Sequence, residues 1–149
     1  MRFDGQWLLC DDGVVRPVLR CEVLAADGFW RAAELLIDTG ADRTVLSANV
    51  LETLRLKGHD SESRIGGIGG TADCVAVNTK LRFTRADLVK VLFRGTYLAC
   101  TDPQSLDMSV LGRDILDMFA VIVDYAGDTV CLLGGQQSYT ITTPGWQQR

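Results

Sequence analysis

The N-terminal third of the chain has no long apolar pattern of helical period; instead, short β-rich stretches alternate with turn signals. We predict strands over Gln6–Cys10, Val14–Leu24 and Phe29–Ile37. The dipeptides Asp12-Gly13 and Asp27-Gly28, which lie between them, tolerate the positive φ of tight hairpin turns. These features predict an antiparallel meander and a mostly β fold.

The rest of the chain continues this pattern, with two short helical interruptions. Ser47 is a suitable N-cap for a short helix that ends near Leu54. A second helix fits Arg113–Met118, with Asp114 as its candidate cap. Further predicted strands are Cys74–Phe83, Leu88–Phe93, Tyr97–Cys100, and a hairpin of Ala120–Tyr125 with Thr129–Leu133. From Gly134 the sequence is polar, and it forms either an interface strand or a loose tail.

Composition limits the architecture to a globular chain. Of the 149 residues, 47% are hydrophobic and only 3 are proline, which excludes low-complexity and collagen-like structures. This length suits one compact domain over residues 1–149.

Charge and the start of the chain bear on partners and location. The 15 basic and 19 acidic residues give a net charge of −4, so we expect no nucleic-acid partner. The sequence has no apolar run of about 20 residues, and Met1–Cys10 lacks the regions of a signal peptide. We therefore expect no membrane partner and a cytoplasmic location.

The cysteines and the histidine do not form a metal-binding pattern. The five cysteines are widely spaced, without Cys-x-x-Cys, and are expected to be free thiols in a reducing compartment. The single histidine, His59, lies between Gly58 and Asp60 and is interpreted as a solvated loop residue. We expect neither a metal site nor a cofactor.

One segment places a carboxylate at the end of an apolar strand. Residues 35–47 read LLIDTGADRTVLS, so Asp38 follows three apolar residues and precedes the turn Thr39-Gly40-Ala41. Alone, the triplet Asp-Thr-Gly also fits a polar turn that closes a strand.

Two further segments favour a functional role for Asp38 over a simple turn. Residues 65–70 read IGGIGG, which suits a mobile hairpin that approaches a ligand backbone closely, and residues 109–114 read SVLGRD, a strand followed by a glycine and a helix start.

Together these three segments resemble the retropepsins, the single-domain aspartic peptidases of retroviruses and their cellular and bacterial relatives. The resemblance covers about residues 14–133 and leaves 134–149 as the tail or interface strand. It implies a single-domain retropepsin-like acid-protease fold, mostly β, closed and β-barrel-like, with a flap hairpin and one or two short helices. It also implies an aspartic endopeptidase acting on peptide or protein substrates.

The resemblance assigns the residues around Asp38. Asp38 would be the catalytic carboxylate, Thr39 would bond its counterpart across a two-fold axis, and Gly40 would let the substrate backbone lie close. Asp42 would accept substrate amides and pair with Arg113.

The remaining assignments are substrate contacts and support. Ile68 at the flap tip would donate its backbone amide to water or substrate, and Arg16 would reach Asp42 of the other subunit. Arg43 would lie at a pocket edge, or else in solvent. The further residues expected to contact substrate are Ala41, Val45, Ile65, Gly66, Gly67, Met108 and Val110.

The mechanism requires two carboxylates, because one group must take a proton from water while another gives one. The chain contains a single Asp-Thr-Gly, so the resemblance implies a homodimer with one Asp38 from each copy. Two alternatives remain: a catalytically weak or silent peptide-binding or dimerisation module with the same fold, and a small β-barrel in which Asp-Thr-Gly is only a turn.

Overall fold

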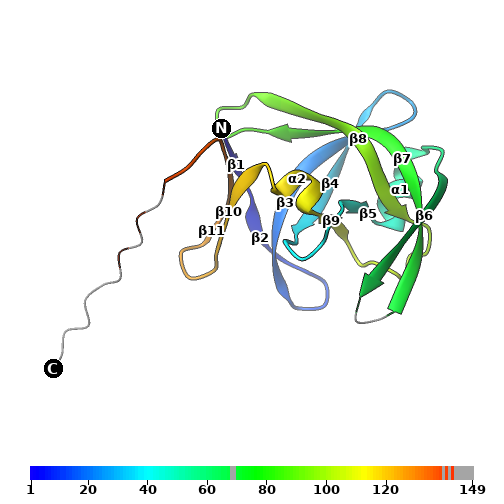
Figure 1. The fold of residues 1–149 in the computed structure, drawn as a ribbon, viewed down its shortest axis with the longest axis horizontal. Coiled ribbons are helices and arrows are strands. Elements are labelled where there is room, and N and C mark those ends of the chain that lie inside the picture. Colours follow the sequence, from blue (N-terminus) through cyan, green and yellow to red (C-terminus); the bar gives the residue numbers. More distant parts are fainter. Residues whose placement is uncertain (68–69, 139, 141, 143–149) are drawn as a thin grey trace.

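The structure is a computed structural model that describes residues 1–67, 70–138, 140 and 142, with the backbone alone for 60–67 and 70–71. Strands dominate, and two short helices interrupt them (Figure 1). The strands are β1 (Arg2–Asp4), β2 (Gln6–Leu9), β3 (Val15–Leu24), β4 (Trp30–Ile37), β5 (Val45–Leu46), β6 (His59–Gly67), β7 (Gly70–Thr84), β8 (Lys90–Cys100), β9 (Ser109–Leu111), β10 (Phe119–Asp124) and β11 (Thr129–Gly134). The helices are α1 (Ala48–Leu54) and α2 (Arg113–Leu116).

The larger sheet curls on itself and closes into a ring. Its order is β2-β3-β4-β9-β5-β8-β7-β6, and β3 also pairs with β7 through Glu22↔Arg82 and Val23↔Leu81. The ring encloses a core of fully buried side chains, among them Leu35, Leu81 and Leu111. The mostly β fold and the consecutive antiparallel pairing of β2, β3 and β4 are therefore confirmed.

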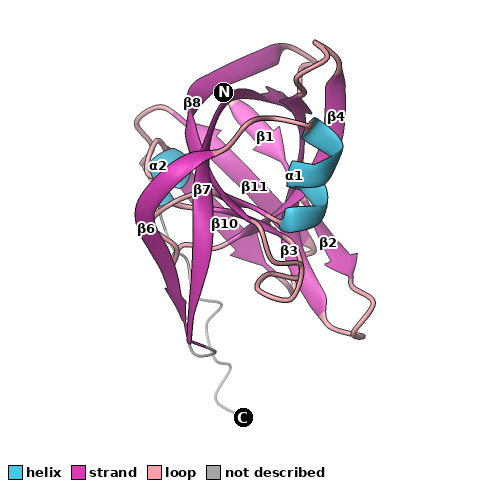
Figure 2. Cartoon of the chain, turned by 90° about the vertical axis from the view of Figure 1, so that its right-hand side faces the viewer, coloured by secondary structure: helices cyan, strands magenta, loops and turns pink. Residues whose placement is uncertain are grey.

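The helix α1 follows from its local sequence. The Oγ of Ser47 accepts a hydrogen bond from Val50 N at 3.5 Å, as expected of an N-cap. Ala48 and Leu54 are buried, and the helix packs against β4 and β8 (Figure 2). The predicted helix is confirmed.

Three predicted elements differ from the structure. The two strands Leu88–Phe93 and Tyr97–Cys100 are one continuous strand, β8, because Gly95 stays in the ladder and the Tyr97 ring covers it. Leu88 is not in a strand, since it lies in the preceding turn with a φ of 69°. The second helix is shorter than predicted and ends at Leu116.

A small second sheet contains the two ends of the described chain. It has the order β1-β11-β10, and all its strands are antiparallel. The β10–β11 hairpin was predicted, whereas the short strand β1 was not. Beyond β11, residues 139, 141 and 143–149 of the predicted tail lie outside the described residues, so the choice between tail and interface strand stays open.

The glycine-rich segment forms the predicted hairpin. Ile65 pairs with Ala72, Gly66 with Thr71 and Gly67 with Gly70, so β6 and β7 leave the ring side by side (Figures 1 and 2). The tip residue Ile68 lies outside the described residues.

Candidate active site

Asp38 lies where two adjacent parallel strands end. β4 runs parallel to β9, with Ile37 opposite Leu111, and Asp38 N donates to Leu111 O at 3.2 Å. The apolar run before Asp38 therefore belongs to the buried ring, while Asp38 itself is half-buried. The fold thus carries this carboxylate out of the core to a partly solvated position.

The turn after Asp38 fixes the orientation of its carboxylate. Gly40 N donates to Asp38 Oδ1 at 2.9 Å, and Ala41 N donates to the carbonyl of Asp38 at 3.2 Å. A Cβ added to Gly40 would come within 3.2 Å of the same Oδ1. Glycine at this position leaves room for the carboxylate, and Thr39 beside it is exposed.

The loop that continues from this turn docks on the start of α2 through backbone hydrogen bonds. Arg113 N donates to Ala41 O at 2.8 Å, and Asp114 N donates to Asp42 O at 3.2 Å. A Cβ on Gly112 would lie 2.4 Å from the carbonyl carbon and oxygen of Arg43. The glycine of the SVLGRD segment is therefore required by this close approach.

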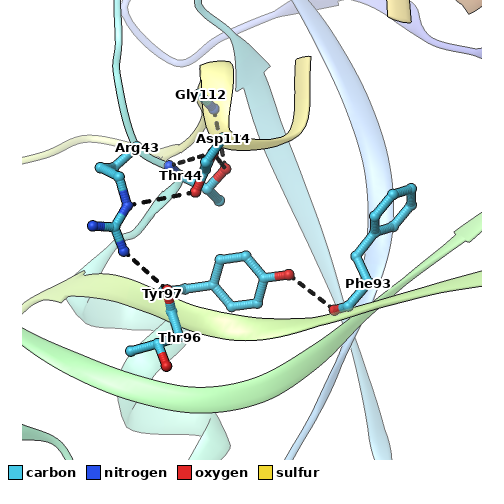
Figure 3. A network of polar contacts seen from close by, with 7 residues as sticks. All are labelled: Arg43, Thr44, Phe93, Thr96, Tyr97, Gly112 and Asp114. Carbon is cyan, nitrogen blue, oxygen red and sulfur yellow. Dashed lines mark hydrogen bonds and ion pairs between the residues drawn. The ribbon is translucent and has the colours of Figure 1, made fainter. Parts of the chain in front are cut away.

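Thr44 connects the loop to α2 from inside (Figure 3). Its side chain is fully buried; its Oγ1 donates to Asp114 Oδ1 at 2.7 Å and accepts from Gly112 N at 3.1 Å. Thr44 N also donates to Asp114 Oδ1 at 2.9 Å. Asp114 was expected to cap α2, which is wrong: the N-cap is Gly112 without a side-chain bond, and Asp114 instead accepts from Thr44.

Arg43 holds the other side of the same loop. Its Nη2 donates to Thr96 O at 3.0 Å, and its Nε lies 3.8 Å from Asp114 Oδ2 (Figure 3). Beside this contact Tyr97 donates its hydroxyl to Phe93 O at 2.9 Å. Burial, and secondarily the negative charge of Asp114, raise the pKa of Tyr97 to about 12, so this hydroxyl stays protonated.

Two further predicted residues form ion pairs within the chain. Arg113 pairs with Asp42, as the resemblance implies, on an exposed surface where such a pair contributes little stability. Arg16 forms two hydrogen bonds to Asp12, at 2.9 and 2.7 Å, and lowers the pKa of Asp12 to about 2. The expected contact of Arg16 with a second subunit stays a prediction.

The predicted pocket residues divide into three groups. Val45 and Val110 are buried and directly paired between β5 and β9, while Met108 is half-buried just before β9. Gly66 and Gly67 lie in the β6–β7 hairpin. The remaining two cannot be placed as side chains: Ile65 is described by its backbone, and Ile68 lies outside the described residues.

Sequence reasoning missed the buried polar pairs behind the site. Ser47 N donates to Ser109 Oγ at 2.9 Å, and both serines are buried, as is Thr44. These residues flank the short apolar runs Val45–Leu46 and Val110–Leu111, and a polar residue next to such a run was the available signal.

The described residues show neither a metal-binding cluster nor a membrane-spanning helix. Within the described part of the chain, no three His, Cys, Asp or Glu side chains come together as a metal-binding group. No helix in that same part is both long and apolar enough to cross a membrane. The five cysteines, all among the described residues, form no disulfide, and four of them are buried.

Comparison with known proteins adds four findings. A model of the family described as gag-polyprotein putative aspartyl protease matches residues 30–118. The structure resembles that of the EIAV protease complexed with the inhibitor HBY-793, with 25% identity, a TM-score of 0.51, and coverage of 68% of this chain and 86% of that one. It also resembles a retropepsin-like aspartic protease from Rickettsia conorii, at 17% identity and a TM-score of 0.52, over 89% of this chain and 91% of that one, which concerns the fold alone. No curated protein matches the chain.

Proposed function

The chain belongs to the gag-polyprotein aspartyl protease family, and from that premise we propose that it is an aspartic endopeptidase whose active form is a homodimer. The observation that carries the proposal is the position of Asp38, half-buried at the end of β4 with one oxygen bound by Gly40 N. The family match includes this residue and the α2 segment against which its loop packs.

The dimer follows from the number of carboxylates that the chemistry needs. Cleaving a peptide bond without a metal requires a base for the attacking water and an acid for the scissile group. The sequence has one Asp-Thr-Gly, so a second copy would supply the other Asp38 about a two-fold axis. Thr39 is exposed beside it and available for the predicted contact with its counterpart.

The two Asp38 carboxylates would share one proton. Carboxylates about 3 Å apart do not both ionise readily, so the pair titrates in two separated steps, as in aspartic proteases generally. In this state one carboxylate takes the proton of water while the other protonates the substrate. Ala41 offers no hydroxyl to stabilise the ionised form, so we expect a pH optimum above that of digestive aspartic proteases.

The substrate would bind as an extended strand beneath the β6–β7 hairpin. Main-chain hydrogen bonds would give affinity, with Asp42 and the backbone of Gly66, Gly67 and Ile68 as partners, and alternate side chains would enter pockets. Apolar residues at Val45, Met108 and Val110 favour apolar side chains next to the cut.

Cleavage of a diverse peptide mixture at several pH values tests this function. We expect pepstatin-sensitive cleavage by the dimer, seen by sedimentation, and loss of at least a thousandfold in rate for the isosteric Asp38→Asn variant. Asp117→Asn, an exposed carboxyl at the end of α2, is the matched control and should retain full activity. Equal cleavage by wild type and Asp38→Asn would refute the proposal, and a dimer that binds peptides without cutting them would favour the silent module.

A further inference from the structure

A pocket lies apart from Asp38, on the side of the ring where β7 and β8 face the end of β3. Its volume is about 430 Å³, within the range of ligand sites. The segment after α1 closes one side, and Gly58 there packs on Val75 so closely that a Cβ would lie 2.5 Å from its Cγ2. The lining residues are Leu24, Ala25, Leu56, Asn78, Thr79, Lys80, Arg94, Gly95 and Thr96.

The charges at this pocket differ from those on the rest of the described surface. Among the lysine and arginine side chains that the structure describes, those without an ion pair are Arg55, Lys57, Lys80 and Arg94; every other one contacts a carboxylate. Lys80 and Arg94 line the pocket, while Arg55 and Lys57 flank the lining residue Leu56. Two of the four unpaired cations therefore line the pocket, and the other two are sequence neighbours of a lining residue.

The arrangement of two of these cations is unfavourable in isolation. Lys80 lies directly opposite Arg94 in the β7–β8 ladder, and like charges in that position repel. The chain has an excess of acidic residues, so partners of opposite charge are not scarce. An anionic ligand between the two side chains would relieve the repulsion.

The pocket lining has an apolar part and a charged part. We call the apolar residues Leu24, Ala25 and Leu56 the floor, and the cations Lys80 and Arg94 the rim. Leu24, Ala25 and Leu56 contribute apolar surface. The neighbouring polar groups are already bonded, because Thr79 Oγ1 donates to Leu24 O at 2.8 Å and Thr96 Oγ1 donates to Asn78 Oδ1 at 2.6 Å. What remains for a ligand is the apolar floor and the cationic rim.

We propose that this pocket binds an acidic peptide segment, with carboxylates at Lys80 and Arg94 and an apolar side chain on Leu24 and Leu56. A peptide supplies both chemistries at the spacing of neighbouring residues, whereas a small inorganic anion would leave the floor uncovered. The site uses no residue of the Asp38 loop, so it stands whether or not the chain cleaves peptides.

Fluorescence anisotropy in the Asp38→Asn background tests this site without cleavage. The probe is a labelled short peptide in which glutamates alternate with leucines. Replacing Lys80 and Arg94 together by glutamine should weaken binding at least about tenfold. The matched control replaces Arg20 and Arg31 by glutamine. These two arginines are paired with Glu34 and Asp27 respectively, so the control should change the affinity for the probe less than about twofold.

Two further arms separate the rim from the floor. A probe peptide with glutamine in place of glutamate should bind with most of the affinity lost and without salt dependence. The variant Leu56→Asn should bind the acidic probe several-fold more weakly than the wild-type protein does. The double variant should unfold at the wild-type temperature or above, because it removes a repulsion. Equal binding by the double variant and its control would overturn the proposal, as would inorganic phosphate or a single-stranded oligonucleotide competing for the pocket better than the acidic peptide.

Discussion

The Asp38 loop and the β7–β8 pocket are neighbours, and they differ in whether their cationic side chains have carboxylate partners. They meet at Thr96, whose carbonyl accepts from Arg43 on the loop side and whose hydroxyl bonds Asn78 on the pocket side. On the loop side, Arg43 and Arg113 each have a carboxylate partner. On the pocket side, Lys80 and Arg94 have none among the described residues.

This difference distinguishes charged side chains that stabilise the structure from charged side chains that are available to bind a ligand. Around Asp38 the polar groups are bonded to each other, so they fix the backbone that presents one carboxylate. At the pocket the cations face solvent and each other, so their binding capacity is unused. The three predictions below test this contrast, and the first has the largest expected effect.

Replacing Gly112 by alanine should strongly destabilise the protein. The new Cβ would overlap the carbonyl of Arg43 and lie 2.8 Å from Thr44 N, both backbone atoms that cannot rotate away. We expect a loss of about 3 kcal/mol in the free energy of unfolding, or a melting temperature lower by roughly 10 °C at equal protomer concentration.

The control for that variant is Gly28→Ala. Gly28 has a φ of 83° and open space around its Cβ position, so alanine there meets backbone strain without a clash. It should cost about 1 kcal/mol. Equal losses in the two variants would contradict the tight docking of the loop on α2.

Replacing either of two arginines on neighbouring strands, Arg82 and Arg94, should change the free energy of unfolding in opposite directions. Arg82 forms two hydrogen bonds to Glu22, both at 2.8 Å, lowers the pKa of that carboxyl, and lies 4.1 Å from the Trp30 ring centroid. Arg82→Gln should lose stability, because it removes both the ion pair and the contact with the Trp30 ring. Arg94→Gln should instead gain a few tenths of a kcal/mol, because it removes the repulsion with Lys80.

Urea unfolding at low and high salt measures both variants. High salt should shrink the difference between Arg94→Gln and wild type, since it screens the repulsion. A loss of stability in Arg94→Gln comparable to that in Arg82→Gln would show that Arg94 is a structural charge and that the contrast is wrong.

The smallest effect concerns Asp12, whose folded pKa lies at about 2, below the ordinary value of 3.8, chiefly through the hydrogen bonds from Arg16. Because the folded value is the lower one, the pair stabilises the protein above about pH 4 and loses this contribution as the pH falls through about 2. A carboxyl NMR titration should find the Asp12 midpoint near 2 in wild type and at a clearly higher pH in Arg16→Gln, where the hydrogen bond from Val14 N still lowers the pKa. The same midpoint in both proteins would contradict the role of Arg16.

Local sequence signals were sufficient for much of the fold. The turn dipeptides bounded β2, β3 and β4, and Ser47 marked the start of α1, because hairpin turns and helix caps depend on residues close together in the chain. Gly95 was misleading for the same reason: a glycine between two apolar stretches resembles a break, whereas in the structure it pairs with Thr79 in the long-range β7–β8 ladder and β8 is continuous.

Long-range contacts were beyond these signals. The ring closure between β3 and β7, the pairing of β1 with β11, and the bond from Thr44 to Asp114 all join residues far apart in the sequence. Asp114 shows the consequence: its local position suggested a helix cap, but the buried Thr44 hydroxyl and amide bind it instead. The unpaired cations of the pocket were likewise invisible before the ladder placed Lys80 opposite Arg94.

Mixing wild-type and Asp38→Asn chains tests the central claim that two copies complete one catalytic site. After exchange of subunits at equal amounts and constant total protein, peptide cleavage should fall to about one quarter of the wild-type rate, because only dimers with two Asp38 carboxylates would work. A fall to about one half, in proportion to the wild-type chain present, would mean that each chain acts alone and would contradict the account.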